Sequence, residues 1–466
     1  METVSDGMAY SRGSATYLIR VVLVATLGGL LFGYDTAVIA GAIGFLQTHF
    51  ELTPAMKGWA ASSALVGCVL GVILAGPNSD HFGRRSTLVL AAILFLVSAV
   101  GTAVPRMFMT FVVFRFIGGV GVGAASITSP MYIAEISPAR VRGRMVSVNQ
   151  FAIVTGMLVV YFVNYFITLH GESIGTDWNV LYGWRWMFAS ETLPALALLG
   201  LLLFVPESPR WLAEQQRTRE ALGILERVNG VERAKQEMHE IQTALAQEPA
   251  TLSQILAPGL RVALLIGVVL AVLQQVTGIN VFLYYAPEIF KTVAGSGVDV
   301  AMLQTVVVGA VNLGFTILAI WLVDRLGRKP LMIVGAAGMG ISLLAVGVAA
   351  MLDQLDTWVL AYILAYIAFF ALSVGPVTWV ILSEIFPTKI RGRAMGIATF
   401  TLWVANFVVS QTFPMMDENP WLIEKFHHGF PFFVYGGFCV VLVMFVIFVV
   451  PETKGKTLEA IEQRWL

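Results

Sequence analysis

The chain has 466 residues, of which 57% are hydrophobic and only 12% are charged, and its mean hydropathy is +0.79. Soluble domains carry about 25% charged residues, and a soluble core cannot bury this much apolar side chain because surface grows too fast with size. The composition therefore predicts a protein whose solvent is lipid. Lysine plus arginine equals aspartate plus glutamate, at 29 each, so the charge balance predicts no nucleic-acid partner.

Twelve apolar segments are long enough to cross a bilayer, which takes about 20 mostly apolar residues. The first begins near residue 17 and is too long for the apolar core of a signal peptide, so we expect it to be retained. Only helices or closed barrels satisfy the backbone in hydrocarbon, and these segments are too long and too uniformly apolar for barrel strands. We predict an all-α membrane protein with spans near 18–46, 57–77, 86–105, 108–134, 145–168, 187–205, 262–290, 301–323, 330–352, 358–385, 394–416 and 430–450.

Positive charge is concentrated in four short loops, after the second, fourth, eighth and tenth spans. These loops hold eleven lysines and arginines, an excess that is typical of the cytoplasmic side. Both termini are therefore predicted to be cytoplasmic, together with a charged central segment that favours short helices. The predicted parts are an N-terminal six-helix half (1–205), a cytoplasmic helical linker (206–259) and a C-terminal six-helix half with a short tail (260–466).

Three motifs occur once in each half at a nearly constant offset. The pairs lie 244, 249 and 245 residues apart: Asp80 and Asp324, Glu135 and Glu384, Pro206 and Pro451. One offset for three motifs indicates two six-span halves repeated in parallel orientation. Such repeats are typical of transporters whose site lies between the halves near the bilayer midplane.

The two cysteines, Cys68 and Cys439, each lie inside an apolar run. We expect small apolar residues in helix packing, because two such cysteines form neither a disulfide framework nor a Cys/His metal cluster. The sequence also contains no nucleophile–base pair and no phosphate-binding loop. It therefore predicts no enzyme, no metal and no cofactor.

Seven short motifs follow one another along the chain, at 33–35, 80–85, 115–123, 206–212, 274–280, 375–379 and 451–455. In order and spacing they resemble those of the sugar porter family of the major facilitator superfamily, over residues 16–462. The resemblance implies the major facilitator fold and a monomer in the lipid bilayer of a bacterial inner membrane. It also implies import of a monosaccharide (xylose, glucose or galactose) in symport with a proton by alternating access.

Side-chain amides and aromatic rings gather in the seventh predicted span. An amide offers two donors and an acceptor to sugar hydroxyls, and a ring covers the C–H faces of the sugar. Amides also bond neighbouring membrane helices, and this alternative stays open for Asn312 and Asn406. The resemblance implies sugar binding by Gln150, Gln274, Gln275, Asn280, Tyr284, Tyr285, Asn312, Trp379, Trp403 and Asn406. Met157 and Leu402 stand where some pentose-carrying relatives have amides, which leaves the identity of the sugar open.

Two ionisable residues lie inside apolar spans of the first half, Asp35 in the first and Arg115 in the fourth. Such side chains are costly in mid-membrane unless paired, and they mark function by default. Burial favours the neutral form of Asp35 and a nearby arginine favours the charged form, so a small helix movement can switch it. The resemblance implies that Asp35 accepts the proton and that Arg115 adjusts the proton affinity of Asp35. A static Asp35–Arg115 bridge is the structural alternative.

Acidic and basic residues recur in the same order at the predicted cytoplasmic end of both halves. Isolated loop charges contribute little, but repetition sets these apart. The resemblance implies bridges that latch the halves when the carrier faces outward. The predicted gate contains Asp80, Arg84, Arg85, Glu135, Arg144, Glu207, Asp324, Arg328, Glu384, Arg393 and Glu452. Gly375-Pro376 is predicted to break the tenth span and to act as a hinge.

Three alternatives from other functional classes stay open. A facilitative uniporter would use Asp35 as a structural partner only. A sugar sensor would be expected to carry a long cytoplasmic tail, and only a short tail follows Val450. A drug exporter of the same superfamily is disfavoured by the amides of the seventh span.

Overall fold

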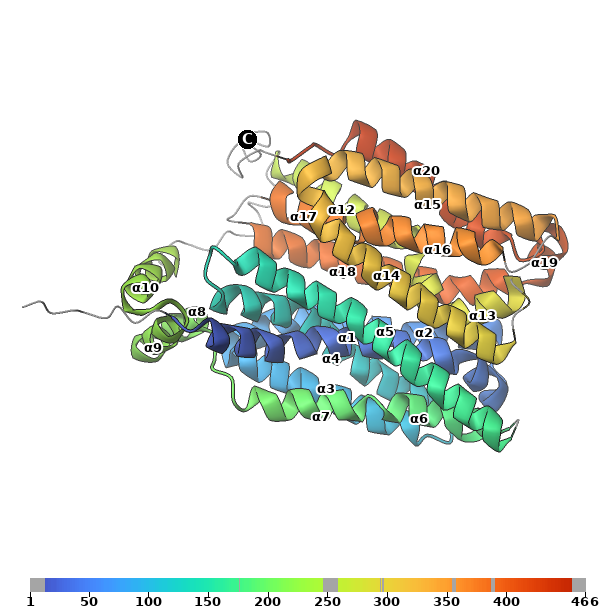
Figure 1. The fold of residues 1–466 in the computed structure, drawn as a ribbon, viewed down its shortest axis with the longest axis horizontal. Coiled ribbons are helices and arrows are strands. Elements are labelled where there is room, and N and C mark those ends of the chain that lie inside the picture. Colours follow the sequence, from blue (N-terminus) through green and yellow to red (C-terminus); the bar gives the residue numbers. More distant parts are fainter. Residues whose placement is uncertain are drawn as a thin grey trace, which may run out of the picture.

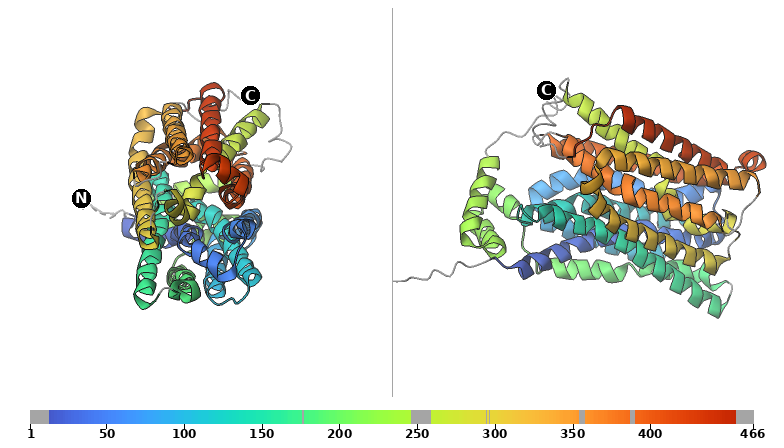
Figure 2. Two further views of the ribbon diagram at one scale, coloured as in Figure 1. Left: turned by 90° about the vertical axis from the view of Figure 1, so that its right-hand side faces the viewer. Right: turned by 45° about the horizontal axis from the view of Figure 1, so that its top comes forward.

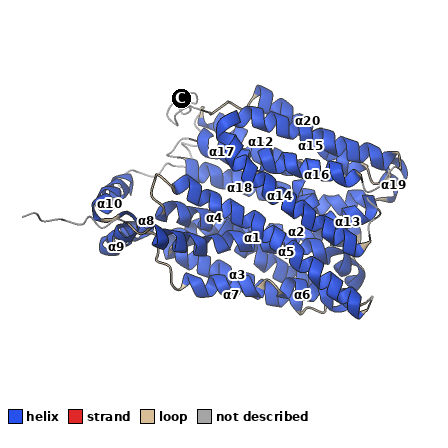
Figure 3. Ribbon diagram, viewed as in Figure 1, coloured by secondary structure: helices blue, strands red, loops and turns tan. Residues whose placement is uncertain are grey.

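The computed structural model describes residues 13–175, 177–245, 259–293, 295, 297–353, 358–386 and 390–454. Within these ranges the chain is helical, and no strand is present (Figure 3). Eleven helical segments of this described part are long and apolar enough to cross a membrane. Large apolar side chains such as Ile73, Val334 and Ile341 are exposed on them, as expected for a lipid-facing surface. The predicted all-α membrane fold is confirmed.

The first helix group follows the chain from Ala15 to Leu202. Its elements are α1 (Ala15–Phe50), α2 (Pro54–Phe82), α3 (Arg84–Ala103), α4 (Phe108–Ile136), α5 (Arg142–Ile174), η1 (Asn179–Gly183), α6 (Trp184–Ala189) and α7 (Thr192–Leu202). The sixth predicted span (187–205) is not one continuous α-helix. It consists of α6 and α7, two short helices that meet at Ser190 and Glu191. With this pair, the twelve predicted spans are accounted for.

The second helix group follows the chain from Leu260 to Phe448. Its elements are α12 (Leu260–Val276), α13 (Ile279–Val293), α14 (Val298–Leu326), α15 (Arg328–Met351), α16 (Val359–Phe369), η2 (Phe370–Val374), α17 (Gly375–Ile385), α18 (Arg391–Asp417), α19 (Pro420–Phe426) and α20 (Phe430–Phe448). The seventh predicted span (262–290) breaks at Thr277 and Gly278. Gly278 has a φ of 92°, a left-handed conformation that favours glycine.

The tenth predicted span is interrupted, but not by proline alone. The π-helical turn η2 comes directly before Gly375, and Pro376 lies in the first turn of α17. At that position the missing N–H of proline costs little. The distortion is therefore centred on the turn just before the predicted Gly375-Pro376 break.

Three short helices lie beyond one end of the bundle, at the left in Figure 1: α8 (Pro209–Glu214), α9 (Thr218–Asn229) and α10 (Val231–Leu245). Ser208 caps α8 by accepting from the backbone N–H of Trp211, and Leu225 and Met238 belong to the small apolar core beneath. We call this end of the bundle the linker end and the opposite one the far end. The predicted short helices of the linker are present, and its remaining residues, 246–258, lie outside the described residues.

The two helix groups lie side by side, with the blue-to-green helices on one side and the yellow-to-red ones on the other (Figures 1 and 2). Across their boundary α1 packs on α13, α2 on α18, and α5 on α14. At the last contact Gly309 faces the ring of Tyr161, whose hydroxyl donates to the backbone oxygen of Leu283 at 2.8 Å. Trp403, one of the residues predicted to bind substrate, reaches this boundary, where its ring lies 5.6 Å from that of Phe32.

Candidate functional site

A buried ion pair joins α1 to α4 inside the first helix group. Nη1 of Arg115 donates to Oδ1 of Asp35 at 2.7 Å and to the backbone oxygen of the same residue at 3.2 Å. The side chains are 1% and 0% exposed. The guanidinium also lies over the ring of Phe188, 5.5 Å from its centroid. The structure brings the two residues of the predicted proton-coupling pair together, and their roles stay a prediction.

A second buried carboxylate, Glu191, lies at the junction of α6 and α7 and was absent from the predicted site. It is 0% exposed and within electrostatic range of Asp35 and Arg115. Neither of its carboxylate oxygens has a hydrogen-bond partner in the described part of the chain. The signal was available in the sequence, because Glu191 is an ionisable residue within an apolar segment, as Asp35 is.

Three further buried polar atoms at the Asp35–Arg115 pair also lack a hydrogen-bond partner within the described residues. They are Oδ2 of Asp35, Nε of Arg115 and Oγ of the neighbouring Ser98. A Cβ at Gly118 would collide with Oγ of Ser98 and lie 3.4 Å from Oδ1 of Asp35, so glycine lets the three helices meet here. Most buried polar groups in proteins are hydrogen-bonded, so this concentration is unusual. With both carboxylates ionised, the two acids and one arginine carry a net charge of −1, which a single proton neutralises.

Amide side chains at the break in the seventh span form a continuous chain of hydrogen bonds. Asn280 donates to Oε1 of Gln275 at 2.5 Å, and Nε2 of Gln275 donates to Oε1 of Gln274 at 3.3 Å. Nε2 of Gln274 then donates to the backbone oxygens of Val374 at 3.2 Å and Gly375 at 3.0 Å. Gln274 thus satisfies carbonyls at the π-helical turn, while Asn280 at the other end is only partly buried.

The two tyrosines of α13 have different partners on α18. Asn406 donates to the hydroxyl of Tyr284 at 3.3 Å and accepts from Ser410 at 3.1 Å. The hydroxyl of Tyr285 donates to the backbone oxygen of Ser410 at 2.9 Å, and its ring lies 5.2 Å from that of Phe413. Tyr284 is therefore joined to another predicted binding residue, whereas Tyr285 packs α13 against α18.

The indole of Trp403 is the clearest unsatisfied donor on the second helix group. It is 4% exposed, and its Nε1–H has no partner in the described part of the chain. Its ring lies 5.6 Å from that of Phe32 in the first group. A buried N–H without a partner carries a free-energy cost, which a ligand hydroxyl at this boundary would remove.

The remaining predicted binding residues are spread over three helices. Gln150 on α5 is partly buried and Asn312 on α14 is buried, and neither side chain makes a hydrogen bond to a described residue. Trp379 on α17 is partly buried and packs on the apolar core. Free amides on α5 and α14, which pack together across the boundary, offer donors and acceptors to a polar ligand.

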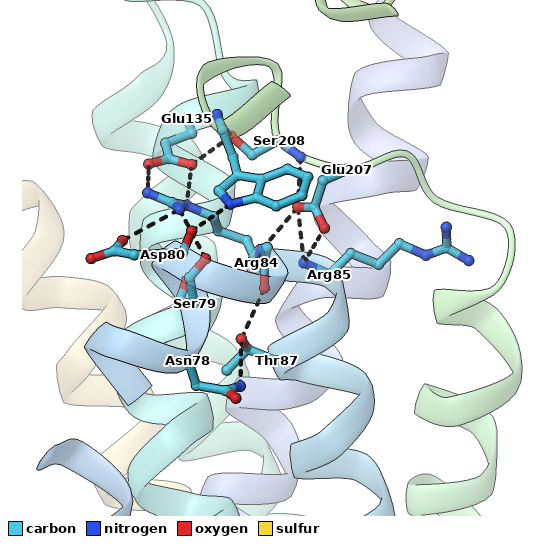
Figure 4. Close-up of polar contacts among 11 residues, drawn as sticks. Asn78, Ser79, Asp80, Arg84, Arg85, Thr87, Glu135, Glu207 and Ser208 are labelled. Carbon is cyan, nitrogen blue, oxygen red and sulfur yellow. Dashed lines mark hydrogen bonds and ion pairs between the residues drawn. The ribbon is translucent and has the colours of Figure 1, made fainter. Parts of the chain in front are cut away.

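The linker end of the first group carries the first charge cluster, which contains Asp80, Arg84, Arg85, Glu135, Glu207 and Ser208 (Figure 4). Arg84 donates to both oxygens of Glu135, at 2.9 Å and 3.0 Å, and lies 3.5 Å from Asp80. Glu207 accepts the backbone N–H groups of Arg84 at 2.9 Å and Arg85 at 3.0 Å. Gly83, with a φ of 96°, allows this approach, because a Cβ there would collide with the Glu207 carboxylate.

The second charge cluster repeats this arrangement in the second group, with Arg328, Lys329, Glu384, Glu452 and Thr453. Arg328 donates to the two oxygens of Glu384 at 3.2 Å and 2.8 Å. Glu452 accepts the backbone N–H groups of Arg328 at 3.2 Å and Lys329 at 3.0 Å. Burial raises the pKa of Glu452, but hydrogen bonds from four backbone N–H groups outweigh this and hold its pKa below the usual value. The side chain of predicted Asp324 lies outside the described residues.

The described bonds of each charge cluster stay within one helix group. Arg144 and Arg393, which were also predicted to belong to the gate, are exposed. Arg144 has no ion pair with a described residue, and the ion pairs of the clusters that join described residues, Arg84–Asp80, Arg84–Glu135 and Arg328–Glu384, each lie within one helix group. The same part of the chain contains no group of three or more His, Cys, Asp or Glu side chains that could hold a metal.

Comparison with known proteins agrees with this geometry. Residues 21–465 match the family "Sugar (and other) transporter". The chain is 48% identical to the D-xylose-proton symporter of Escherichia coli strain K12, over 97% of this chain and 96% of that protein. It is 42% identical to the arabinose-proton symporter of Bacillus subtilis strain 168, with the same coverage. A glucose facilitated diffusion protein of Zymomonas mobilis is 40% identical, over 98% of this chain and 99% of that protein.

Solved structures of the E. coli xylose transporter have the same fold. A partially occluded inward open conformation superposes with a TM-score of 0.85, at 45% identity, over 95% of this chain and 100% of that one. A crystal structure of the D-xylose-proton symporter gives 0.80, at 47% identity and with the same coverage. The resemblance seen in the sequence is confirmed: the chain belongs to the sugar transporter family of the major facilitator superfamily.

Proposed function

We propose that this protein imports a monosaccharide in symport with a proton. The observation that carries the proposal is the buried cluster of Asp35, Arg115 and Glu191. It contains one more acidic group than basic groups, so the binding of one proton makes it electrically neutral. A carrier that moved sugar alone would not require an uncompensated carboxylate in the membrane, where it is costly. Tyr284, which bonds Asn406 of the proposed sugar site, lies within electrostatic range of Asp35 and Arg115, which supports coupling between the two sites. Two relatives named as sugar–proton symporters support the same activity.

The sugar site of this proposal lies at the boundary between the helix groups. Gln275, Asn280 and Asn406 supply amides there, and Trp403 supplies an unpaired indole N–H. Gln150, Asn312 and Trp379 complete the site as predicted from the sequence. Gln274 has a double role, because it also bonds the carbonyls of η2. The cargo is a xylose-, glucose- or galactose-type sugar.

Transport proceeds by movement of two halves, 1–205 and 260–466, joined by the linker 206–259. The loops of the linker end hold most of the loop lysines and arginines, so this end and both termini face the cytoplasm. The far end faces the outside of a bacterial inner membrane, in which the protein works as a monomer. Closure there, through bonds such as Ser62 to Gln411 at 2.7 Å, and the similarity to an inward open conformation support an inward-facing state. In the outward-facing state the two charge clusters close the linker end.

Transport in proteoliposomes tests the proposal, using a panel of sugars and an imposed proton gradient. We expect the wild type to accumulate one of the sugars and to alkalinise the medium during uptake. Asp35→Asn removes the proton acceptor and should reduce accumulation at least about ten-fold while sugar exchange continues. Asp177→Asn, at an exposed loop position, is the control and should behave as wild type. Accumulation by Asp35→Asn at the wild-type level would contradict the proposal.

Facilitative uniport is the second candidate. It is favoured by the close Asp35–Arg115 bond, which can be purely structural, and by the relative named as a facilitated diffusion protein. For a uniporter, sugar uptake would equilibrate without accumulation. It would also be insensitive to a protonophore and cause no alkalinisation, so the same assay separates the two.

A further inference from the structure

A buried lysine bridges the two helix groups at the far end of the bundle. Lys57, at the start of α2, is 6% exposed. Its Nζ lies 3.2 Å from Oε2 of Glu288 on α13 and 2.8 Å from Oε1 of Glu418, directly after α18. Lys57 lies in the first turn of α2, and the structure places its side chain between two elements of the other group. A buried ammonium requires such partners, because an unpaired one is too costly.

The surrounding charges balance in this closed arrangement. Lys291 is 2.8 Å from Oε1 of Glu288, one turn away on the same helix. Gln47 at the end of α1 donates to the other oxygen of Glu418 at 3.4 Å. Two lysines and two glutamates give the site no net charge. Of these four charged residues, Lys57 is the one that belongs to the first helix group, so its ion pairs cross the boundary between the groups.

Close helix approach at the same end makes the contact specific. A Cβ at Gly44 on α1 would collide with the Glu288 carboxylate. A Cβ at Gly58, the residue after Lys57, would lie 2.5 Å from the backbone oxygen of Gln411 on α18. The side chain of Gln411 in turn donates to the backbone oxygen of Ala55 at 3.0 Å. The glycines thus let α1 and α2 approach α13 and α18 closely enough for the lysine to reach both acids.

We propose that Lys57, Glu288 and Glu418 form an ionic latch that holds the far end closed and must break before this end opens. Opening separates α2 from α13 and α18. The ion pairs of Lys57 with the two glutamates then break, and water solvates all three side chains. The latch thereby sets the ratio of inward-facing to outward-facing molecules. It rests on the proposed alternating access but not on the identity of the sugar or on proton coupling.

Accessibility of the closed interface tests the latch. Ser62 on α2 is 0% exposed and bonds Gln411 across the boundary, so a cysteine there reacts with a membrane-impermeant maleimide only when the far end opens. The full-length protein is used with Ser62→Cys, Cys68→Ala and Cys439→Ala. Adding Lys57→Met should raise the labelling rate about ten-fold, because it removes both ion pairs that hold the closed state, and their joint contribution is of that order.

Two matched variants separate the latch from a general effect of lost charge. Lys291→Met also removes a lysine from Glu288, but both residues lie on α13, so labelling should stay within about two-fold of the parent. The charge swap Lys57→Glu with Glu418→Lys keeps one ion pair across the boundary but places the new glutamate beside Glu288, so it should slow the labelling part of the way back to the parent rate. Labelling of Lys57→Met at the parent rate, or an equal rise in Lys291→Met, would overturn the latch.

A folding control and a coupling control complete the experiment. The thermal midpoint of each variant in detergent identifies misfolding, and the swap variant keeps the test valid where Lys57→Met is unstable. The same labelling in the Asp35→Asn background should still depend on Lys57. If sugar accumulation is never observed but the labelling pattern holds, the proposed symport fails and the latch survives. If sugar accumulates with the proton gradient but labelling does not depend on Lys57, the latch is disproved and the proposed symport stands.

Discussion

The two charge clusters at the linker end share their parts but differ in their surroundings. The side chains of Arg84 and Glu135 are 7% and 10% exposed, against 13% and 22% for Arg328 and Glu384. The first cluster is also tied to α8, because the indole of Trp211 donates to the backbone oxygen of Asp80 at 2.8 Å. The copy of the motif in the first group is thus bonded to a linker helix, whereas the copy in the second group is more exposed to solvent. We infer that the first copy contributes more to stability and that the second exchanges partners more readily.

The largest expected difference comes from removing the central arginine of each cluster. Arg84→Met leaves Glu135 buried without its bidentate partner and should cost about 3 kcal/mol of stability. Arg328→Met strands a more exposed glutamate and should cost about 1 kcal/mol. Thermal midpoints in detergent measure both, with Arg140→Met at an exposed position as the control. Equal losses would show that the difference in burial has no energetic consequence.

An intermediate effect is expected from exchanging the neighbouring basic residues. Arg85 donates to two backbone oxygens, of Leu202 at 2.8 Å and Leu203 at 3.2 Å, whereas Lys329 donates to one, of Ile447 at 2.7 Å. Arg85→Lys should therefore lose one bond, at about 1 kcal/mol, because a lysine cannot replace the guanidinium fork. Lys329→Arg should be neutral within about 0.5 kcal/mol. The same thermal assay applies, and a larger loss in Lys329→Arg would reverse the comparison.

The smallest effect concerns pH and the second cluster. Since the pKa of Glu452 is held below its usual 4.5, its stabilising contribution is present above that value and is lost as pH falls through the folded pKa. Glu452→Gln should therefore be less stable than wild type at neutral pH, and the gap should shrink below about pH 4. Midpoints measured across that range test this, with exposed Glu424→Gln as the control. A gap independent of pH would exclude the electrostatic origin.

Much of the fold could be predicted from the sequence because its causes are local. Apolar segments define the spans, and the repeated charges around Asp80 and Asp324 define the halves. The helix breaks were harder to predict, because their conformations depend on distant side chains. The ring of Tyr435 packs against Gly278, and the hydroxyl of Tyr366 donates to the backbone oxygen of Thr277 at 2.9 Å.

The site could be predicted only where one residue carries the signal. Asp35 and Arg115 stand out as single charges in apolar segments, and Glu191 would have stood out by the same criterion. Lys57 could not be identified in this way, since its partners Glu288 and Glu418 lie 231 and 361 residues away along the chain. Pairings at such separation leave no pattern in a single sequence.

The break at Thr277 and Gly278 makes α13 a separate helix with contacts to different parts of the protein near its two ends. Asn280 at its first turn bonds Gln275 of α12, and Glu288 nearer its other end bonds Lys57. The helix rises about 12 Å between these two residues, and Pro287 lies inside it, directly before Glu288. Because the backbone is interrupted just before it, α13 can tilt without dragging α12 along. The proposed sugar site and the proposed latch therefore share one helix, and we infer that sugar binding at Asn280 is transmitted through α13 to the contact between Glu288 and Lys57.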